Sequence, residues 1–328
     1  MSQAADPRDA GDRISRPAVG SRGFSFDHIY QGILVTAATG IFLIVALIVF
    51  EVVRGALPSI RVLGWGFLVD TDWDPVQNHF GALPYVYGTL VSSLLALLLA
   101  VPIGIGTSVF LAELAGRRLS EITSFVMELL AAIPSIVFGI WGLFVLAPFL
   151  RTSVEPWLIR NFGNIPLFHG YPFGIGMLNA GIVLSIMILP TIVSISREVL
   201  LATPRSLREA SLALGATRAE AIGVTLDAAR PGSLGAVLLA LGRAIGETMA
   251  VTMVIGNANR ISPSLLDPAA TMASIIANEF TEATTELYLS ALIQIALVLF
   301  AVTLLVNALA RGLVLWTTGG RRDVAGAA

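Results

Sequence analysis

The strongest constraint on the fold of this chain is a run of 22 residues, Ile29 to Phe50, that contains no charged side chain. An α-helix needs about 20 apolar residues to cross roughly 30 Å of hydrocarbon, so this run is long enough to span a bilayer. It is too long for the core of a secretory signal peptide, and no small-residue cleavage site follows it. Comparable runs predict six transmembrane helices, near residues 29–53, 84–112, 123–150, 174–197, 233–256 and 287–311.

The composition indicates a polytopic membrane protein of the all-α class. Hydrophobic residues make up 55% of the 328 residues and charged residues only 13%, which is about half of the roughly 25% found in soluble domains. The mean hydropathy is +0.83. A soluble chain of this length needs more charge to cover its surface.

The residue types that are absent exclude several kinds of chemistry. The chain has no cysteine, and all 20 of its basic residues are arginine, which excludes disulfides, thiolate metal sites, P-loop lysines and Schiff bases. His28, His79 and His169 do not have the spacing of metal ligands, and a net charge of −2 does not favour nucleic acid. We therefore expect no catalytic residue, no metal and no cofactor.

The arginines predict how the chain is oriented in the membrane. Six spans place both termini on the same side of the membrane. If that side is the cytoplasm, the cytoplasmic segments hold 14 arginines and the outer segments hold five. Because cytoplasmic loops carry the excess of basic residues, we expect both termini in the cytoplasm. Residues 1–28 are predicted to be a disordered cytoplasmic tail, 29–315 the transmembrane domain and 316–328 a second cytoplasmic tail.

The longest predicted cytoplasmic connection, residues 198–232, has the pattern of two helices. Thr203 before Pro204 favours a helix start, Gly215 favours a stop, and a second helix is predicted from Thr217 to just before Pro231. Such a unit on the inner face suits the transmission of force from a cytoplasmic partner. An amphipathic connector lying at the interface is an equally good interpretation of the pattern.

The fifth predicted span carries two charges at membrane depth. Arg243 and Glu247 are four residues apart, so on one helix they share a face at about 6 Å. Arg243 lies about 15 Å into the span at 1.5 Å per residue. An arginine there costs roughly 2.5–3.5 kcal/mol on insertion scales, so it is either half of a structural ion pair or a guanidinium that faces a pathway and neutralises an anion.

The predicted cytoplasmic connection resembles a motif of ABC-type import permeases. Glu209-Ala210-Ser211 followed by Gly215 is similar to the Glu-Ala-Ala loop of that family, with Ser211 in place of the second alanine. The resemblance implies that Glu209, Ala210 and Gly215 form the coupling contact with a separate ATPase subunit. The closing Ile-x-Leu-Pro of that loop is not intact, because the chain has Thr225-Leu226-Asp227 and no proline until Pro231.

Three further segments resemble one family of these permeases, the PstC-type membrane subunits of bacterial phosphate ABC importers. They are Gly-Arg-Ala-Ile-Gly-Glu-Thr-Met-Ala-Val-Thr-Met at 242–253, the stretch 128–146 that begins Glu-Leu-Leu-Ala-Ala-Ile-Pro, and 88–115. The similarity is colinear over about residues 30–315. It implies a type I ABC importer permease fold, with Arg243 and Glu247 in phosphate translocation and Glu128 as a structural intramembrane charge.

The same resemblance implies the partners and the location of the chain. The partners are a second permease of the PstA type, a dimer of PstB-type ATPase subunits, a PstS-type extracytoplasmic phosphate-binding protein and inorganic phosphate, in the bacterial cytoplasmic (inner) membrane. The chain is then not an enzyme, because no Gly-x-x-x-x-Gly-Lys sequence is present. Nucleic acid is not expected as a partner.

Four other interpretations stay open at this point. The chain resembles the PstA-type subunit in Arg-Ala-Ile-Gly-Glu-Thr, and one arginine does not distinguish phosphate from molybdate, sulfate or phosphonate. A membrane enzyme would need a base or metal ligand beside Arg243 and Glu247, and the sequence supplies neither. A sensor would need an appended signalling domain, which is not visible.

Overall fold

The computed structural model describes residues 24–319, which form an almost entirely helical chain. Its elements in chain order are α1 (Phe24–Leu63), α2 (Gly66–Val69), β1 (Trp73–Asp74), β2 (His79–Phe80), α3 (Leu83–Val109), η1 (Phe110–Leu114), α4 (Arg117–Ala132), α5 (Ser135–Trp141), η2 (Gly142–Leu146), α6 (Ala147–Phe149), η3 (Leu150–Val154), α7 (Glu155–Phe162), η4 (Pro166–Phe168), α8 (Met177–Ala202), α9 (Arg205–Ala213), α10 (Arg218–Ile245), α11 (Met249–Val254), α12 (Met272–Glu279) and α13 (Glu286–Gly319).

Six helical segments of the described chain are long and apolar enough to cross a membrane, which confirms the predicted number. They are Ile29–Leu63, Leu83–Leu114, Ser135–Phe162, Met177–Ala202, Arg218–Ile245 and Glu286–Gly312. Most of the two predicted tails, residues 1–23 and 320–328, lies outside the described residues. Residues 24–28 and 316–319, which we assigned to the tails, are helical.

The chain divides into two compact units, Met1–Glu51 and Val52–Ala328, so α1 contributes to both. The first unit presents an apolar helix whose side chains are mostly exposed. In the second unit, the end of α1 is joined to α13 by buried polar contacts. Ser290 donates its hydroxyl to the carbonyl of Gly55 at 2.8 Å and accepts from the amide of Ser59 at 2.9 Å, and the hydroxyl of Ser59 donates to Gln294.

The larger hydrophobic cluster of the second unit is centred on α8, with α3 and α10 packed on it, and small residues set their spacing. A Cβ at Gly181 in α8 would lie 2.4 Å from Leu95 of α3, and one at Gly232 in α10 would lie 2.5 Å from Val199 of α8. Ala96, Ala240 and Ala244 are buried in the same cluster. Small residues let membrane helices approach closely, so dispersion contacts accumulate where burial from water contributes little.

The third predicted span, 123–150, is divided in the structure. Helix α4 ends at Ala132, Ile133 has an extended ψ of 128° before Pro134, and α5 begins at Ser135. The ring of a proline disfavours helical backbone at the residue before it, so Pro134 separates two helices where we expected one span over 123–150. Beyond it, α5 to α7 form the span at Ser135–Phe162, which includes two π-helical turns, η2 and η3.

The fifth span also differs from its prediction. We expected one helix to end before Pro231 and another to run over 233–256, but α10 is continuous from Arg218 to Ile245 with Pro231 inside it. The reason is a buried face of small residues at helical spacing that continues on both sides of the proline: Ala221, Thr225, Ala229, Ser233, Ala236, Ala240 and Ala244. The packing of this face against α8 and α3 offsets the free energy that is lost with the backbone hydrogen bond that a proline removes.

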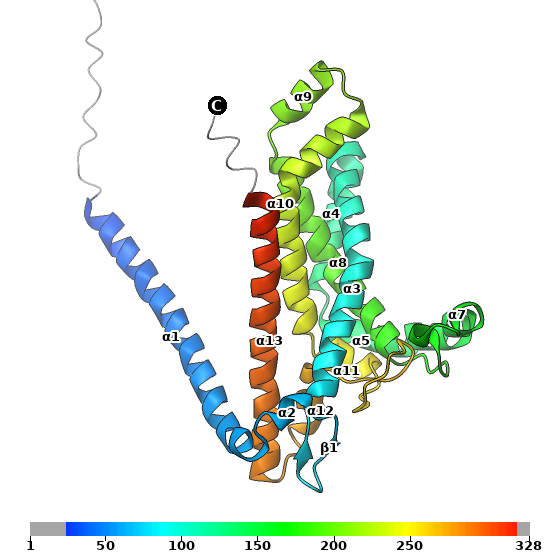
Figure 1. Ribbon diagram of the computed structural model, residues 1–328. Coiled ribbons are helices and arrows are strands. Elements are labelled where there is room, and N and C mark those ends of the chain that lie inside the picture. Colours follow the sequence, from blue (N-terminus) through cyan, green and yellow to red (C-terminus); the bar gives the residue numbers. More distant parts are fainter. Residues whose placement is uncertain (1–23, 320–328) are drawn as a thin grey trace, which may run out of the picture. The chain divides into compact units, whose positions relative to one another are not determined.

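The second unit has two ends that differ in structure, and we name them by elements that Figure 1 labels. The α9 end holds α9 and the junction of η1 with α4. The β1 end holds α2, the β1–β2 hairpin and α12, with α7 and its loops nearer to it than to α9. In the hairpin, Trp73 lies opposite Phe80 and Asp74 opposite His79, in antiparallel register.

Candidate functional site

The predicted helix, glycine turn and second helix are present at the α9 end (Figure 1). Gly215 has a φ of +89°, which L-residues with a side chain rarely adopt, and Thr217 caps α10 through reciprocal hydrogen bonds with Glu220. The predicted cap at Thr203 is wrong. Helix α9 begins at Arg205, and the Thr203 hydroxyl donates to the carbonyl of Val199 at the end of α8.

Helix α9 presents its side chains to solvent. None of its residues is buried, and Glu209 and Ala210 are both exposed. Leu207, Leu212 and, just after the helix, Leu214 are also exposed, Leu214 by 89%. Exposed apolar side chains gathered on one short helix are typical of a surface that binds another protein.

One ion pair joins α9 to a part of the bundle that is far away in sequence. A guanidinium nitrogen of Arg208 lies 2.6 Å from Oε2 of Glu113, whose side chain is 8% exposed. Glu113 belongs to η1, the π-helical turn at the end of the second span. Our sequence reasoning missed both residues, because a separation of 95 positions leaves no periodic signal between them.

A cavity of about 560 Å³ lies under α9. Its walls come from the ends of the second and fourth spans, α9 and the start of α10: Ala112, Glu113, Leu200, Leu201, Thr203, Pro204, Arg205, Arg208, Glu209, Leu212, Arg218 and Thr225. Both residues of the ion pair between Arg208 and Glu113 therefore line this cavity.

Arg243 and Glu247 do not share a helix, which corrects the predicted geometry. Arg243 is in the last turn of α10, and the helix ends at Ile245. Gly246, Glu247 and Thr248 form a break before α11, and Oε1 of Glu247 accepts the amide of Ala250 at 3.1 Å. Within the described residues, no hydrogen bond or ion pair joins the half-buried Arg243 side chain to another group, so the ion-pair interpretation has no support there.

The surface beside Arg243 is open in this chain. A Cβ at Gly242 or at Gly235, about two turns earlier in α10, would meet nothing within 4 Å. Leu239 and Met249 are exposed by 61% and 55%, and Gly246 is exposed in the break itself. These residues give the end of α10 and the start of α11 an uncovered, mainly apolar surface.

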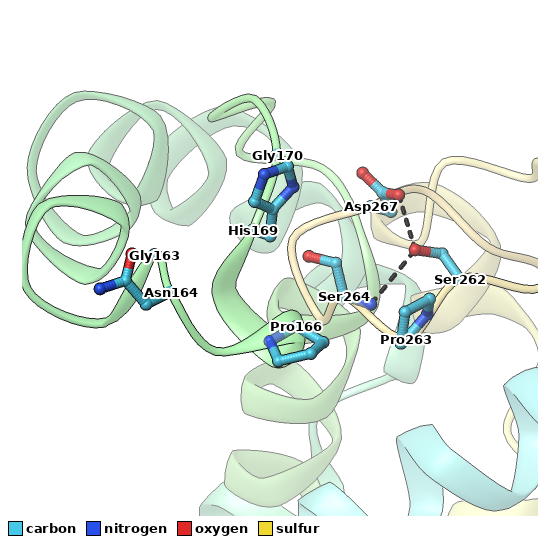
Figure 2. Close-up of a pocket in the computed structure, with 9 residues that line it drawn as sticks. All are labelled: Gly163, Asn164, Pro166, His169, Gly170, Ser262, Pro263, Ser264 and Asp267. Carbon is cyan, nitrogen blue, oxygen red and sulfur yellow. Dashed lines mark hydrogen bonds between the residues drawn. The ribbon is translucent and has the colours of Figure 1, made fainter.

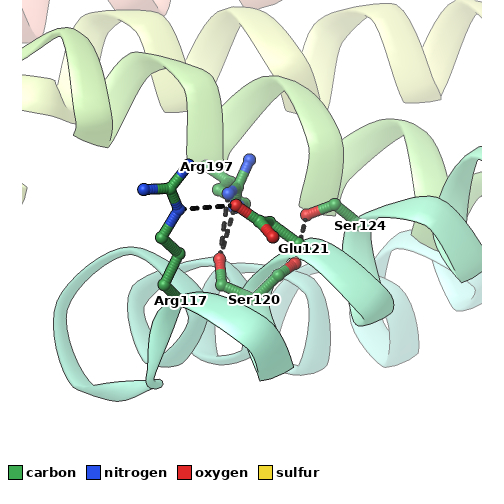
Figure 3. Close-up of polar contacts among 5 residues, drawn as sticks. All are labelled: Arg117, Ser120, Glu121, Ser124 and Arg197. Carbon is green, nitrogen blue, oxygen red and sulfur yellow. Dashed lines mark hydrogen bonds and ion pairs between the residues drawn. The ribbon is translucent and has the colours of Figure 1, made fainter.

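Glu128, which we expected to be a structural intramembrane charge, has no polar partner among the described residues. It lies on α4 with its side chain exposed, and no hydrogen bond or ion pair joins it to any described residue. The polar contacts of α4 are closer to its start (Figure 3): Arg197 of α8 donates from Nε and a terminal nitrogen to the hydroxyl of Ser120, at 3.1 and 2.9 Å. Arg117 and Glu121 form an exposed ion pair at 2.8 Å.

A pocket of about 400 Å³ lies between the loop after α7 and the loop before α12 (Figure 2). The Ser262 hydroxyl donates to Asp267 at 2.7 Å and accepts the amide of Ser264 at 3.2 Å. A terminal nitrogen of Arg260 lies 3.7 Å from Oδ2 of Asp267. His169 and Asn164 also line the pocket, and within the described part of the chain there is no cluster of acidic and histidine side chains able to hold a metal ion.

Comparison with known proteins identifies the family. Residues 104–316 match the family described as the binding-protein-dependent transport system inner membrane component. The chain belongs to this family. It is therefore a permease component of a binding-protein-dependent transport system and is not itself catalytic, as the resemblance implied.

Relatives with high identity cover most of the chain. The phosphate transport system permease protein PstC of Mesorhizobium japonicum is 46% identical over 304 residues, which are 91% of this chain and 93% of that protein. The protein of the same description from Haemophilus influenzae is 45% identical over 83% of this chain and 87% of its own length. A probable PstC of Methanocaldococcus jannaschii is 35% identical over 81% and 87%.

A solved structure shares the fold. The MetNI methionine ABC transporter, in an inward-facing conformation, has a chain that superposes with a TM-score of 0.52 at 20% identity, covering 70% of this chain and 93% of its own. The fold of the multi-pass bundle is thus that of an ABC importer permease.

Proposed function

We propose that this chain is the PstC-type permease subunit of an ATP-driven importer of inorganic phosphate, and that it lines half of the translocation pathway. The observation that carries the proposal is Arg243, a half-buried guanidinium at the end of α10 with no partner among the described residues, in a chain 46% identical to a phosphate transport permease. An unpaired charge at membrane depth is costly, so it is retained where it meets a charged ligand or water.

The helix break beside Arg243 supports the same proposal. Non-helical backbone at membrane depth is tolerated where it is buried in protein or lines a water-filled cavity, and Gly246 in this break is exposed. Glu247 holds the start of α11 through the Ala250 amide, so in this proposal it fixes the shape of the break next to Arg243. The forked guanidinium donates two parallel hydrogen bonds to a phosphate passing the break.

The exposed α9 is the proposed coupling helix, with Glu209, Ala210 and the Gly215 turn against the ATPase subunit. In this proposal α9 and both termini are in the cytoplasm of a bacterium and the β1 end is outside the inner membrane, which the arginine excess supports. The uncovered surface at Leu239, Gly242 and Met249 is the proposed contact with a PstA-type permease across the pathway. A PstS-type binding protein delivers phosphate to the β1 end.

The test is uptake of labelled phosphate by cells that lack their own high-affinity importer and express this chain with its partner subunits. Arg243→Gln should lower uptake at least about tenfold, because a hydrogen bond to a charged group contributes roughly 1.5–3 kcal/mol. Arg260→Gln, an exposed arginine in the loop before α12, is the matched control and should leave uptake unchanged.

Competition separates phosphate from the other oxyanions. Excess sulfate or molybdate should not reduce labelled-phosphate uptake by the wild-type complex. An assembled complex that takes up molybdate or sulfate instead would reassign the substrate, and undiminished uptake by Arg243→Gln would remove Arg243 from the pathway.

A further inference from the structure

The ion pair between Arg208 and Glu113 links the proposed coupling helix to the second span. By covalent connection α9 joins only the fourth span, through Thr203 and Pro204, and the fifth, through the Gly215 turn. The ion pair adds a contact with η1, at the end of the second span, at an N–O distance of 2.6 Å.

The ion pair lies at the wall of a cavity that both elements line. Ala112 and Glu113 of η1 and Arg208 and Leu212 of α9 face the same cavity of about 560 Å³, so the pair joins α9 and η1 beside a space that packing leaves open. The Glu113 side chain is 8% exposed and that of Arg208 is 39% exposed. A nearly buried carboxylate that loses its cation is strongly destabilised, which keeps the pair closed.

The turn that carries Glu113 is π-helical. Residues Phe110–Leu114 continue α3 without interruption, and the chain then turns at Ala115, which has an extended ψ of 141°. Short π-helical turns inside α-helices occur frequently at functional sites. A force applied at Glu113 therefore acts on the last turn of the second span, close to the junction with α4.

We propose that the Arg208–Glu113 ion pair is a mechanical link that makes the second span move with the coupling helix when the ATPase subunits close. The proposal rests on the proposed function of α9. In it, Glu113 and Arg208 are positioning residues that transmit the ATPase motion to the second span, in addition to the motion that passes along α8 and α10.

The first test measures phosphate transported per ATP hydrolysed, in proteoliposomes that hold the complete transporter. Glu113→Gln and Arg208→Gln should each lower this ratio at least about fivefold, since coupling between sites is typically a 5–150-fold effect, while the complex still assembles and hydrolyses ATP. The double variant with the charges exchanged, Glu113→Arg with Arg208→Glu, should recover most of the lost phosphate transport per ATP. A merely structural role would lower assembly and leave the ratio of the assembled complex unchanged.

Arg117→Gln is the matched control for the first test. Its ion pair with Glu121 has nearly the same N–O distance, 2.8 Å, but lies within one helix and is exposed. The ratio should not change. A ratio that is unchanged in both single variants at positions 113 and 208 overturns the proposal.

The second test does not depend on which anion is transported. The chain has no cysteine, so Glu113→Cys with Arg208→Cys adds the only two thiols of this subunit, and a short bifunctional thiol reagent reports their proximity. If α9 and the second span move together, the rate of cross-linking is the same with and without ATP. A rate that falls severalfold with ATP means that the two separate, which overturns the link even if phosphate uptake is confirmed.

Discussion

The two ends of the second unit are held together in different ways. At the β1 end the polar contacts are half-buried and share one acceptor. Glu279 accepts hydrogen bonds from the indole of Trp73 and the hydroxyl of Tyr288, both at 2.6 Å, and Phe80 stacks on Tyr288 with ring centroids 5.5 Å apart. At the α9 end, α9 buries no residue, and the long-range polar contacts include the pairs of Arg208 with Glu113 and of Arg197 with Ser120.

A second cluster extends this difference to the loop that leads into α8. Gly174 is buried and is held from both sides, because its amide donates to the carboxylate of Glu155 and its carbonyl accepts from the side chain of Asn179, each at 2.8 Å. Glu155 is 1% exposed and Asn179 is fully buried. Hydrogen bonds between buried groups favour one arrangement, so this loop is held by buried polar contacts, whereas α9 buries no residue.

The largest difference between the ends is expected at two glycines with positive φ. A Cβ at Gly174 would lie 2.2 Å from the carbonyl oxygen of Ala147, whereas a Cβ at Gly215 meets nothing within 4 Å. Gly174→Ala should destabilise the protein by roughly 2–5 kcal/mol, from the backbone conformation plus overpacking, and Gly215→Ala by roughly 1–2 kcal/mol from the conformation alone. Thermal unfolding of the purified complex, followed by fluorescence-detected size-exclusion chromatography, measures both. Equal losses of stability in the two variants would mean that a Cβ at Gly174 does not clash with the carbonyl of Ala147.

The carboxylate of Glu155 tests the buried network directly. Glu155→Leu leaves the amide of Gly174 buried without an acceptor, which costs about 1–3 kcal/mol. Glu155→Gln keeps an oxygen at the same place and is the matched control. In the same chromatographic assay, we expect a clearly lower melting temperature for the leucine variant than for the glutamine variant. If the two variants melt together, the hydrogen bond to Gly174 does not stabilise this end.

A smaller effect is expected where α8 meets α4. Arg197→Gln removes the two donors that reach Ser120 and should lower stability by about 1 kcal/mol. Ser124→Ala, which removes a hydroxyl bonded only within α4, should be close to neutral. Urea or heat titration of the two variants side by side measures the difference. A neutral Arg197→Gln would show that packing alone holds α4 on α8.

The smallest effect is expected for the exposed pair at the start of α4. The hydrogen bond and charge of Glu121 raise the pKa of Arg117, but both side chains are exposed by more than half. Exposed ion pairs contribute little and are screened by salt. Arg117→Gln should therefore leave the melting temperature unchanged at every salt concentration. A clear, salt-dependent fall in the melting temperature would show that this exposed ion pair does stabilise the α9 end.

The candidate sites show where sequence reasoning succeeds and where it stops. The turn at Gly215 and the cap at Thr217 follow from local rules that need only neighbouring residues, and both are present. The sequence also singled out Arg243 and Glu247, but the predicted geometry of the two was wrong, because we assumed a regular helix through Gly246. The break depends on how α11 packs against α5 and α8, which no local rule contains.

The amino-acid sequence by itself determined the class of the protein, the number of apolar spans, the turn before α10 and the family. Each of these follows from composition, run length or short spacing, which are properties of residues close together in the chain. Only the tertiary structure decided that α10 runs through Pro231, that α4 is separate from α5, and that Glu113 meets Arg208 across 95 positions. Those outcomes depend on which helix faces pack together, and packing energy is summed over residues that are distant in sequence.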